Sequence, residues 1–162
     1  VASPYTAHVL ARGSEEVWYE HPELLHPIDV DRTVGDGDVI GSGDIRLRCL
    51  ATPGHTPGSM SYVLPTAAGT VVFSGDLLMP DGAPGWAGSS GFSVASSIVS
   101  LRRLQKLSPQ RVLTGHGELP GGIDAWLSTA ITTGANGEWE LKSEPQATAV
   151  PAALARWRRP DD

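Results

Sequence analysis

The chain has 162 residues, of which 40% are hydrophobic and 19% are charged, and its formal net charge at pH 7 is −6. This length and composition fit one globular domain, residues 1–162, and exclude a disordered chain. The acidic balance argues against nucleic acid as a partner, the sequence has no apolar run of membrane-spanning length, and the one cysteine, Cys49, excludes an internal disulfide.

Taken in chain order, the hydrophobic pattern predicts one β-sheet with covering helices, and therefore an α/β fold. Strands are expected at 3–9, 33–34, 39–40, 45–50, 60–64, 70–74 and 110–113, with a hairpin joining 60–64 to 70–74. Helices are expected at 93–107, 123–132 and 149–157, whereas 14–25 is expected to be helical or irregular. Apolar residues recur three or four positions apart in 93–107, which predicts a helix with one face in the core and Ser93 as its N-cap.

One histidine stands between two Pro-Gly pairs at the end of a predicted strand. The segment is Thr52-Pro53-Gly54-His55-Thr56-Pro57-Gly58-Ser59, and it follows the apolar run 45–50. Proline fixes φ and glycine permits turns that other residues avoid, so this loop holds its shape before any ligand arrives. The pattern favours a metal ligand or a catalytic base at His55 over an ordinary turn histidine.

Two further loops repeat this design after predicted strands. Asp76 follows 70–74 in the run Ser74-Gly75-Asp76, and His116 follows 110–113 in the run Gly115-His116-Gly117. Taken alone, each could be a turn residue. Three strand-end loops that present His, Asp and His together predict a metal site, with all three side chains at one edge of the sheet.

The motifs in this order resemble the metallo-β-lactamase superfamily of metal-dependent hydrolases. The resemblance spans 30–122 and rests on Asp36-Gly37-Asp38-Val39-Ile40, on 52–59, on Ser74-Gly75-Asp76-Leu77-Leu78 and on Thr114-Gly115-His116-Gly117. It implies an αββα sandwich, of which this chain would supply one half and part of the other. It also implies that His55 binds a first metal ion, that His116 binds a second, and that Asp76 bridges them as the catalytic carboxylate.

One family motif is missing from the chain. The superfamily carries His-x-His-x-Asp-His ahead of these loops as a source of further metal ligands, and no such run is present here. The chain starts at Val1, close to where that motif would end, so we expect a fold truncated at the N-terminus and the C-terminal portion of a longer protein. A natural two-chain arrangement, or a member that has lost its metals, is the alternative.

The resemblance implies two zinc ions in the complete protein, with iron or manganese as alternatives. Water held between two such ions has a lowered pKa and attacks a carbonyl group. Aspartate at position 76 favours the glyoxalase-II-like and lactonase-like branches, because one group of true β-lactamases has cysteine at the matching place. Trp86 and Phe92 lie in the loop that follows, where they are candidate contacts for a partly apolar acyl or ring substrate, although Trp86 could instead anchor the loop.

We therefore expect a metallo-hydrolase that cleaves a thioester, a lactone or a related ester of a small molecule. This chain would supply part of a dinuclear site and would be inactive alone. The alternatives are a non-catalytic fragment that depends on a partner chain, and a redox member with a di-iron site. A homodimer or a complementing N-terminal chain is the expected partner, and the cytoplasm is the default location.

Overall fold

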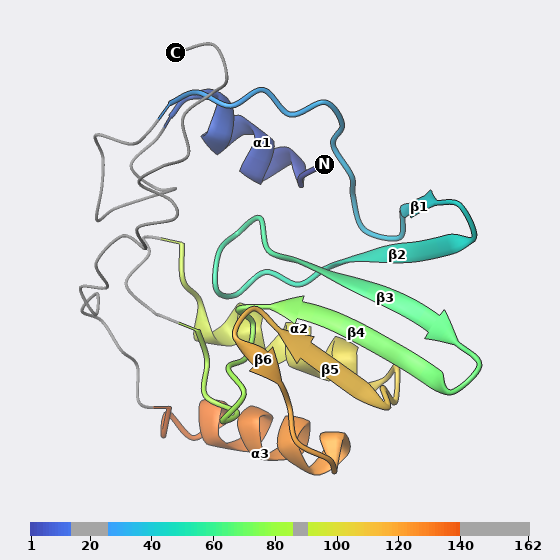
Figure 1. The fold of residues 1–162 in the computed structure, drawn as a ribbon. Helices are drawn as coiled ribbons and strands as arrows, with labels where there is room; N and C mark the ends of the chain where they lie inside the picture. The colour runs from blue at the N-terminus through green and yellow to red at the C-terminus, as the bar shows by residue number, and fades with distance from the viewer. Residues whose placement is uncertain (14–25, 86–90, 140–162) are drawn as a thin grey trace, which may run out of the picture.

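The computed structural model describes residues 1–13, 26–85 and 91–139. These contain a six-stranded sheet in the order β1-β2-β3-β4-β5-β6 (Figure 1). The strands are β1 (Val39–Ser42), β2 (Ile45–Ala51), β3 (Met60–Thr66), β4 (Gly69–Gly75), β5 (Arg111–Thr114) and β6 (Gly117–Glu118), and the helices are α1 (Pro4–Ala11), α2 (Val94–Gln105) and α3 (Ile123–Ala135). Among the described helices, none is long and apolar enough to cross a membrane.

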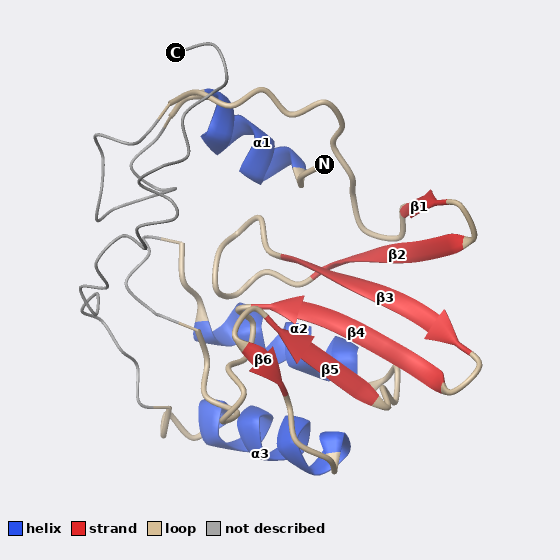
Figure 2. Cartoon of the chain, in the orientation of Figure 1, coloured by secondary structure: helices blue, strands red, loops and turns tan. Residues whose placement is uncertain are grey.

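The sheet is mixed, with one parallel pair (Figure 2). Strands β1 to β4 form an antiparallel meander, in which Arg48 faces Val63 and Val63 faces Val72. The parallel pair is β4 and β5, with Val72 opposite Val112, and α2 forms the crossover between them. Parallel strands need such a long connection, whereas the predicted 60–64/70–74 hairpin needs only the short turn that is seen here.

Helices α2 and α3 cover one face of this sheet. Val63, Val72 and Val112 are paired across three strands, and all three belong to a buried cluster with Leu101 and Leu104 of α2. Helix α2 begins where the sequence predicted, because the Ser93 hydroxyl accepts a hydrogen bond from the Ser96 N–H. The predicted 93–107 and 123–132 helices are thus confirmed, whereas 14–25 and 149–157 lie outside the described residues.

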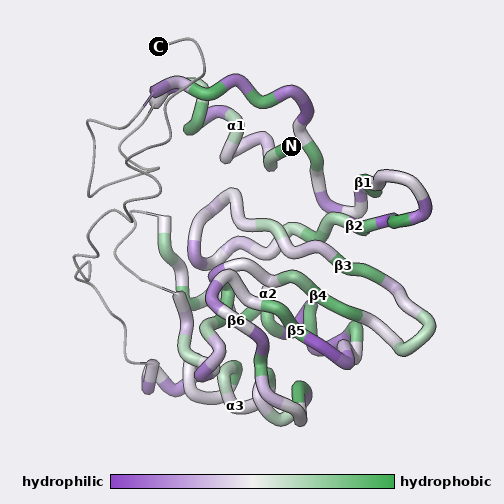
Figure 3. The backbone as a smooth tube through the Cα atoms, in the orientation of Figure 1, coloured by the Kyte–Doolittle hydropathy of each residue, from purple (hydrophilic) through white to green (hydrophobic). Residues whose placement is uncertain are grey.

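The opposite face of the sheet is also apolar. Tyr62, Phe73 and Leu113 are paired across β3, β4 and β5, and Leu64 lies beside Val71 in the next row. None of these five residues is buried, and Phe73 is 37% exposed. Figure 3 shows the resulting hydrophobic character along β3 and β4. Two apolar faces are typical of a sheet that lies between two layers.

The strand predicted at 3–9 is wrong, because these residues form helix α1 instead. Ser3 is its N-cap and Pro4 occupies the first turn. A proline is tolerated there because a backbone N–H at this position has no acceptor within the helix. The strand predicted at 33–34 is reduced to a single bridge between Thr33 and Ala2. Cys49 is buried, as expected for a small apolar side chain in the middle of β2.

An ion pair ties α2 to the end of β2 and to the turn before β1. Arg103 donates from Nη2 to both carboxylate oxygens of Asp36, at 2.9 and 3.0 Å. The same carboxylate accepts the Ala51 N–H at 2.8 Å, while Arg103 Nη1 donates to the Ala51 carbonyl oxygen at 2.8 Å. The pair therefore binds both polar groups of Ala51, whose strand partner on the other side is Met60.

The burial of α2 in the core predicts that shortening one of its buried side chains greatly lowers the stability of the fold. Leu104→Ala should lower the free energy of unfolding by about 2–5 kcal/mol, because it opens a cavity in a fully buried cluster. Val99→Ala is the control on the same helix, since Val99 is 57% exposed, and it should change stability by less than about 0.5 kcal/mol. Denaturant unfolding followed by circular dichroism measures both, and equal losses would contradict this packing.

The Asp36–Arg103 pair predicts a dependence of stability on pH. The hydrogen bond from Arg103, and then that from the Ala51 N–H, lower the pKa of Asp36 below its ordinary value of 3.8. The stabilisation is therefore present above pH 3.8 and is lost as the pH falls through the lowered pKa. Asp36→Asn should cost stability at pH 7, and the difference from the unaltered chain should shrink in acid.

Unfolding midpoints between pH 7 and strongly acidic pH test this expectation. Asp44→Asn is the matched control, because Asp44 lies exposed between β1 and β2 and its side chain makes no hydrogen bond or ion pair with another described residue. A difference between the Asp36 variant and the unaltered chain that stays constant down to strongly acidic pH would contradict the assigned contact.

Candidate metal centre

The candidate ligands lie at one edge of the sheet because three strands share a direction. Strands β2 and β4 are each antiparallel to β3, and β5 is parallel to β4, so all three run the same way. Their carboxyl ends lead into the loops that carry His55, Asp76 and His116. In Figure 1 these loops lie together on the left of the sheet, as the sequence predicted.

The Asp76 carboxylate lies between the two imidazoles. Its Oδ2 is 3.8 Å from His55 Nε2 and 3.6 Å from His116 Nε2. Both distances are too long for a hydrogen bond, so one oxygen faces two ring nitrogens across small gaps. The side chains are 22% exposed at His55, 34% at Asp76 and 56% at His116, and solvent therefore reaches the site from the His116 side.

The His55 loop is closed by its own hydrogen bonds. The Gly54 N–H donates to the Thr56 carbonyl, the Thr56 N–H donates to the Ser59 hydroxyl, and the two hydroxyls lie 2.8 Å apart. The Ser93 N–H at the start of α2 donates to the Gly54 carbonyl. The loop is therefore braced from inside and from α2, as its Pro-Gly frame predicted.

The other two loops are held by the parallel strand pair. The register of β4 shifts between Phe73 and Gly75, where Gly75 takes a left-handed φ of 55° and turns the chain toward Asp76. The Gly115 N–H donates to the Gly75 carbonyl across the pair, and the Thr114 hydroxyl accepts the His116 N–H. Asp76 and His116 are consequently positioned by one shared piece of backbone.

Two glycines crowd the site. A Cβ on Gly115 would collide with Asp76 Oδ1, and one on Gly85 would collide with the Asp76 carbonyl oxygen and lie 2.9 Å from His55 Nδ1. Only glycine allows the backbone to come this close to the carboxylate and the imidazole. Gly115 lies inside a predicted motif, whereas Gly85 was not predicted, and its local signal is the Gly/Pro-rich run 80–91.

The match to a protein-family model decides the family. Residues 1–116 match the model of the metallo-beta-lactamase superfamily. The chain belongs to this superfamily. A hydroxyacylglutathione hydrolase of Brucella anthropi is 33% identical over 135 residues, which is 82% of this chain but 45% of that protein. The chain thus spans less than half the length of that relative, and both findings support a hydrolase.

Solved structures of the superfamily match the fold. A metallo-beta-lactamase family protein from Thermus thermophilus is 22% identical with a TM-score of 0.61, covering 82% of this chain and 45% of that one. TTHA1623, solved in a di-iron-bound form, is 27% identical with a TM-score of 0.60, covering 80% of this chain and 61% of that one. The metallo-β-lactamase-like α/β fold is therefore confirmed.

The donors of His55, Asp76 and His116 fit a divalent metal ion, which they would enclose only in part. Two ligands of a tetrahedral zinc ion, at bond lengths of about 2.1 Å, lie about 3.4 Å apart, close to both Nε2–Oδ2 distances. Among the described residues, no three His, Cys, Asp or Glu side chains are arranged around one ion. The Asp76 oxygen between the two imidazoles therefore offers one His–Asp pair of donors on either side.

Of the two candidate substrate contacts, the structure describes only Phe92. Trp86 lies outside the described residues. Phe92 is partly buried and directly precedes Ser93, whose N–H is bonded to Gly54 next to His55. The backbone at Phe92 therefore adjoins the His55 loop, and its contact with a substrate remains a prediction.

The crowding at Gly115 gives a test of the Asp76 position. Gly115→Ala should push the Asp76 carboxylate away from the imidazoles and lower the affinity for zinc by about 10-fold or more. Mutation of residues that orient a metal ligand lowers metal affinity by this amount in other proteins. Gly121→Ala is the control, because a Cβ there meets nothing within 4 Å and its φ is ordinary. Zinc titration against a competing chelator measures both, and equal affinities would place the carboxylate elsewhere.

Proposed function

We propose that this chain supplies the C-terminal part of a dinuclear metal site in a hydrolase of acyl thioesters. The observation that carries the proposal is the single Asp76 oxygen that faces His55 and His116 at 3.8 and 3.6 Å. Lactones and related esters are the next substrate class, because their carbonyl chemistry is the same. Zinc is the proposed metal, and iron is the alternative that the di-iron-bound relative supports.

Each residue has one role in this proposal. His55 and His116 offer the Nε2 lone pairs of neutral imidazoles, and Asp76 offers a carboxylate that is shared between the two half-sites. Gly85 and Gly115 keep the backbone close enough for that sharing. When bound, the metal ions would lower the pKa of a water molecule and polarise the substrate carbonyl.

A thioester is favoured over a β-lactam by two features. The similar protein from Brucella anthropi is named hydroxyacylglutathione hydrolase, which is a thioester hydrolase. The residue at position 76 is aspartate, where one group of β-lactamases has cysteine. Phe92, beside the His55 loop, is the proposed contact for the acyl part, together with Trp86.

The described residues supply only part of the ligand set. With two donors from them, each ion would lack the third and fourth ligands that zinc sites normally have. The apolar face with Tyr62, Phe73 and Leu113 is the place where a second layer of the fold would pack. We propose that a preceding segment of the same protein carries both that layer and His-x-His-x-Asp-His.

The second candidate is a partner-dependent chain without activity of its own. It is favoured by the incomplete ligand set among the described residues. His-x-His-x-Asp-His upstream in the same reading frame would rule out this candidate, and the metal content of the purified 162-residue chain, measured by inductively coupled plasma mass spectrometry, shows whether the ligands present are sufficient. Near-stoichiometric zinc or iron would mean that the chain, or a second copy of it, completes the site, whereas absence of metal moves the missing ligands to another segment.

Substitution of His116 tests the hydrolase proposal directly. The chain is produced with the preceding part of its reading frame and assayed on a hydroxyacyl thioester of glutathione, a simple lactone and a β-lactam. His116→Ala should remove most of the thioester hydrolysis, because it takes one donor from its half-site. His26→Ala is the control, since His26 is exposed beside α1, and a fully active His116→Ala enzyme would defeat the proposed ligand.

A further inference from the structure

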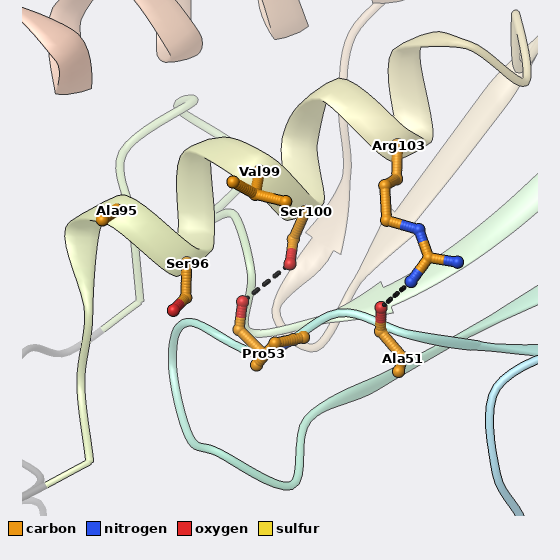
Figure 4. Close-up of a pocket in the computed structure, with 7 residues that line it drawn as sticks. All are labelled: Ala51, Pro53, Ala95, Ser96, Val99, Ser100 and Arg103. Atoms are coloured by element: carbon orange, nitrogen blue, oxygen red, sulfur yellow. Dashed lines mark hydrogen bonds between the residues drawn. The ribbon is translucent and has the colours of Figure 1, made fainter.

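Helix α2 meets the backbone just ahead of His55 through polar groups, unlike the apolar face that it turns to the core. The Ser100 hydroxyl donates to the Pro53 carbonyl at 2.7 Å, and Arg103 donates to the Ala51 carbonyl at 2.8 Å (Figure 4). Both side chains point from the helix toward residues 51–53 in Figure 4. These contacts join positions 47 and 52 residues apart in the sequence.

The contact at Ala51 replaces a missing strand neighbour. On the β1 side, the backbone pairing of β2 ends at Cys49, which is bonded to Gly37 and Asp38, so Ala51 lies beyond this edge partner. Asp36 and Arg103 together bind the N–H and the carbonyl of Ala51 on that open side. The strand is thereby fixed on both edges at its last residue, four positions before His55.

The contact at Pro53 fixes the start of the loop. Ser100 is 1% exposed, so its hydrogen bond is shielded from water and its loss would leave the Pro53 carbonyl without this donor. One turn earlier on α2, Ser97 lies so close to Gly54 that a Cβ on the glycine would collide with it. The loop therefore rests against the helix at three points, Ala51, Pro53 and Gly54.

We propose that Ser100 and Arg103 are positioning residues for His55, which hold the backbone of residues 51–54 so that its imidazole is presented toward Asp76. The inference rests on the proposed metal site, and it adds two residues that touch neither a metal ion nor a substrate. Arg103 is suited to the role because its planar fork reaches Asp36 and Ala51 at once, which a lysine ammonium cannot do. His116, held by β5, does not depend on this contact.

The test is a zinc titration of the chain produced with the preceding part of its reading frame, followed by ¹H–¹⁵N spectra that resolve the imidazoles of His55 and His116. In Arg103→Met, the zinc concentration that half-shifts the His55 signal should rise by about 10-fold, as for other residues that orient a ligand. The His116 signal should titrate as in the unaltered chain. Arg103→Lys should lie between the two, and Ser100→Ala should show the same selective effect.

Matched controls on the same helix separate positioning from general destabilisation. Arg102→Met removes the same charge from an exposed side chain, and Ser96→Ala removes a hydroxyl that makes no hydrogen bond among the described residues. Neither should change the His55 titration. Amide hydrogen exchange at Ala51 gives a metal-free reading, which should quicken in Arg103→Met and not in Arg102→Met.

The outcomes are distinct. An unchanged His55 titration in Arg103→Met and Ser100→Ala, or an equal weakening at His55 and His116, would overturn the positioning roles and leave the metal site standing. If zinc shifts neither histidine in this extended chain without substitutions, the proposed site itself fails, and the positioning roles fail with it. If Arg103→Met does not fold, Arg103→Lys and Ser100→Ala decide the matter.

Discussion

The common direction of β2, β4 and β5 is the constraint on which the arrangement of this molecule depends. The loop after a strand lies at the edge of the sheet where that strand ends. Because three strands run the same way, the loops with His55, Asp76 and His116 lie at one edge. The antiparallel β3 lies between β2 and β4 and contributes no candidate ligand, because its carboxyl end is at the far edge. The pairing of the strands thus sets the spacing of the three candidate ligands across the sheet.

Different neighbours hold the two sides of the site. Asp76 and His116 share the parallel β4–β5 backbone, whereas His55 depends on its own Pro-Gly loop and on α2. The shared oxygen of Asp76 is where these two supports meet, since it faces both imidazoles. The two distances from this oxygen to the imidazoles therefore depend on two separate parts of the fold.

The sequence predicted the local features well and the long-range contacts poorly. Each ligand loop carried its own glycine or proline signal, and the sequence of α2 indicated both its core face and its Ser93 cap. Residues 3–9 were misassigned because their pattern was interpreted as a short strand in spite of the Ser3-Pro4 signal of a helix start. Gly85 and the Arg103–Asp36 pair could not be predicted, because they acquire their roles only when segments far apart in sequence come together.

The composition of α2 has a consequence for how the site opens. Ser96, Ser97 and Ser100, together with the β-branched Val94, Ile98 and Val99, give this helix a low intrinsic propensity to form alone. Its persistence therefore depends on docking against the sheet and against residues 51–54. Helix and loop consequently belong to one cooperative unit of local unfolding, and a fluctuation that releases α2 also releases His55.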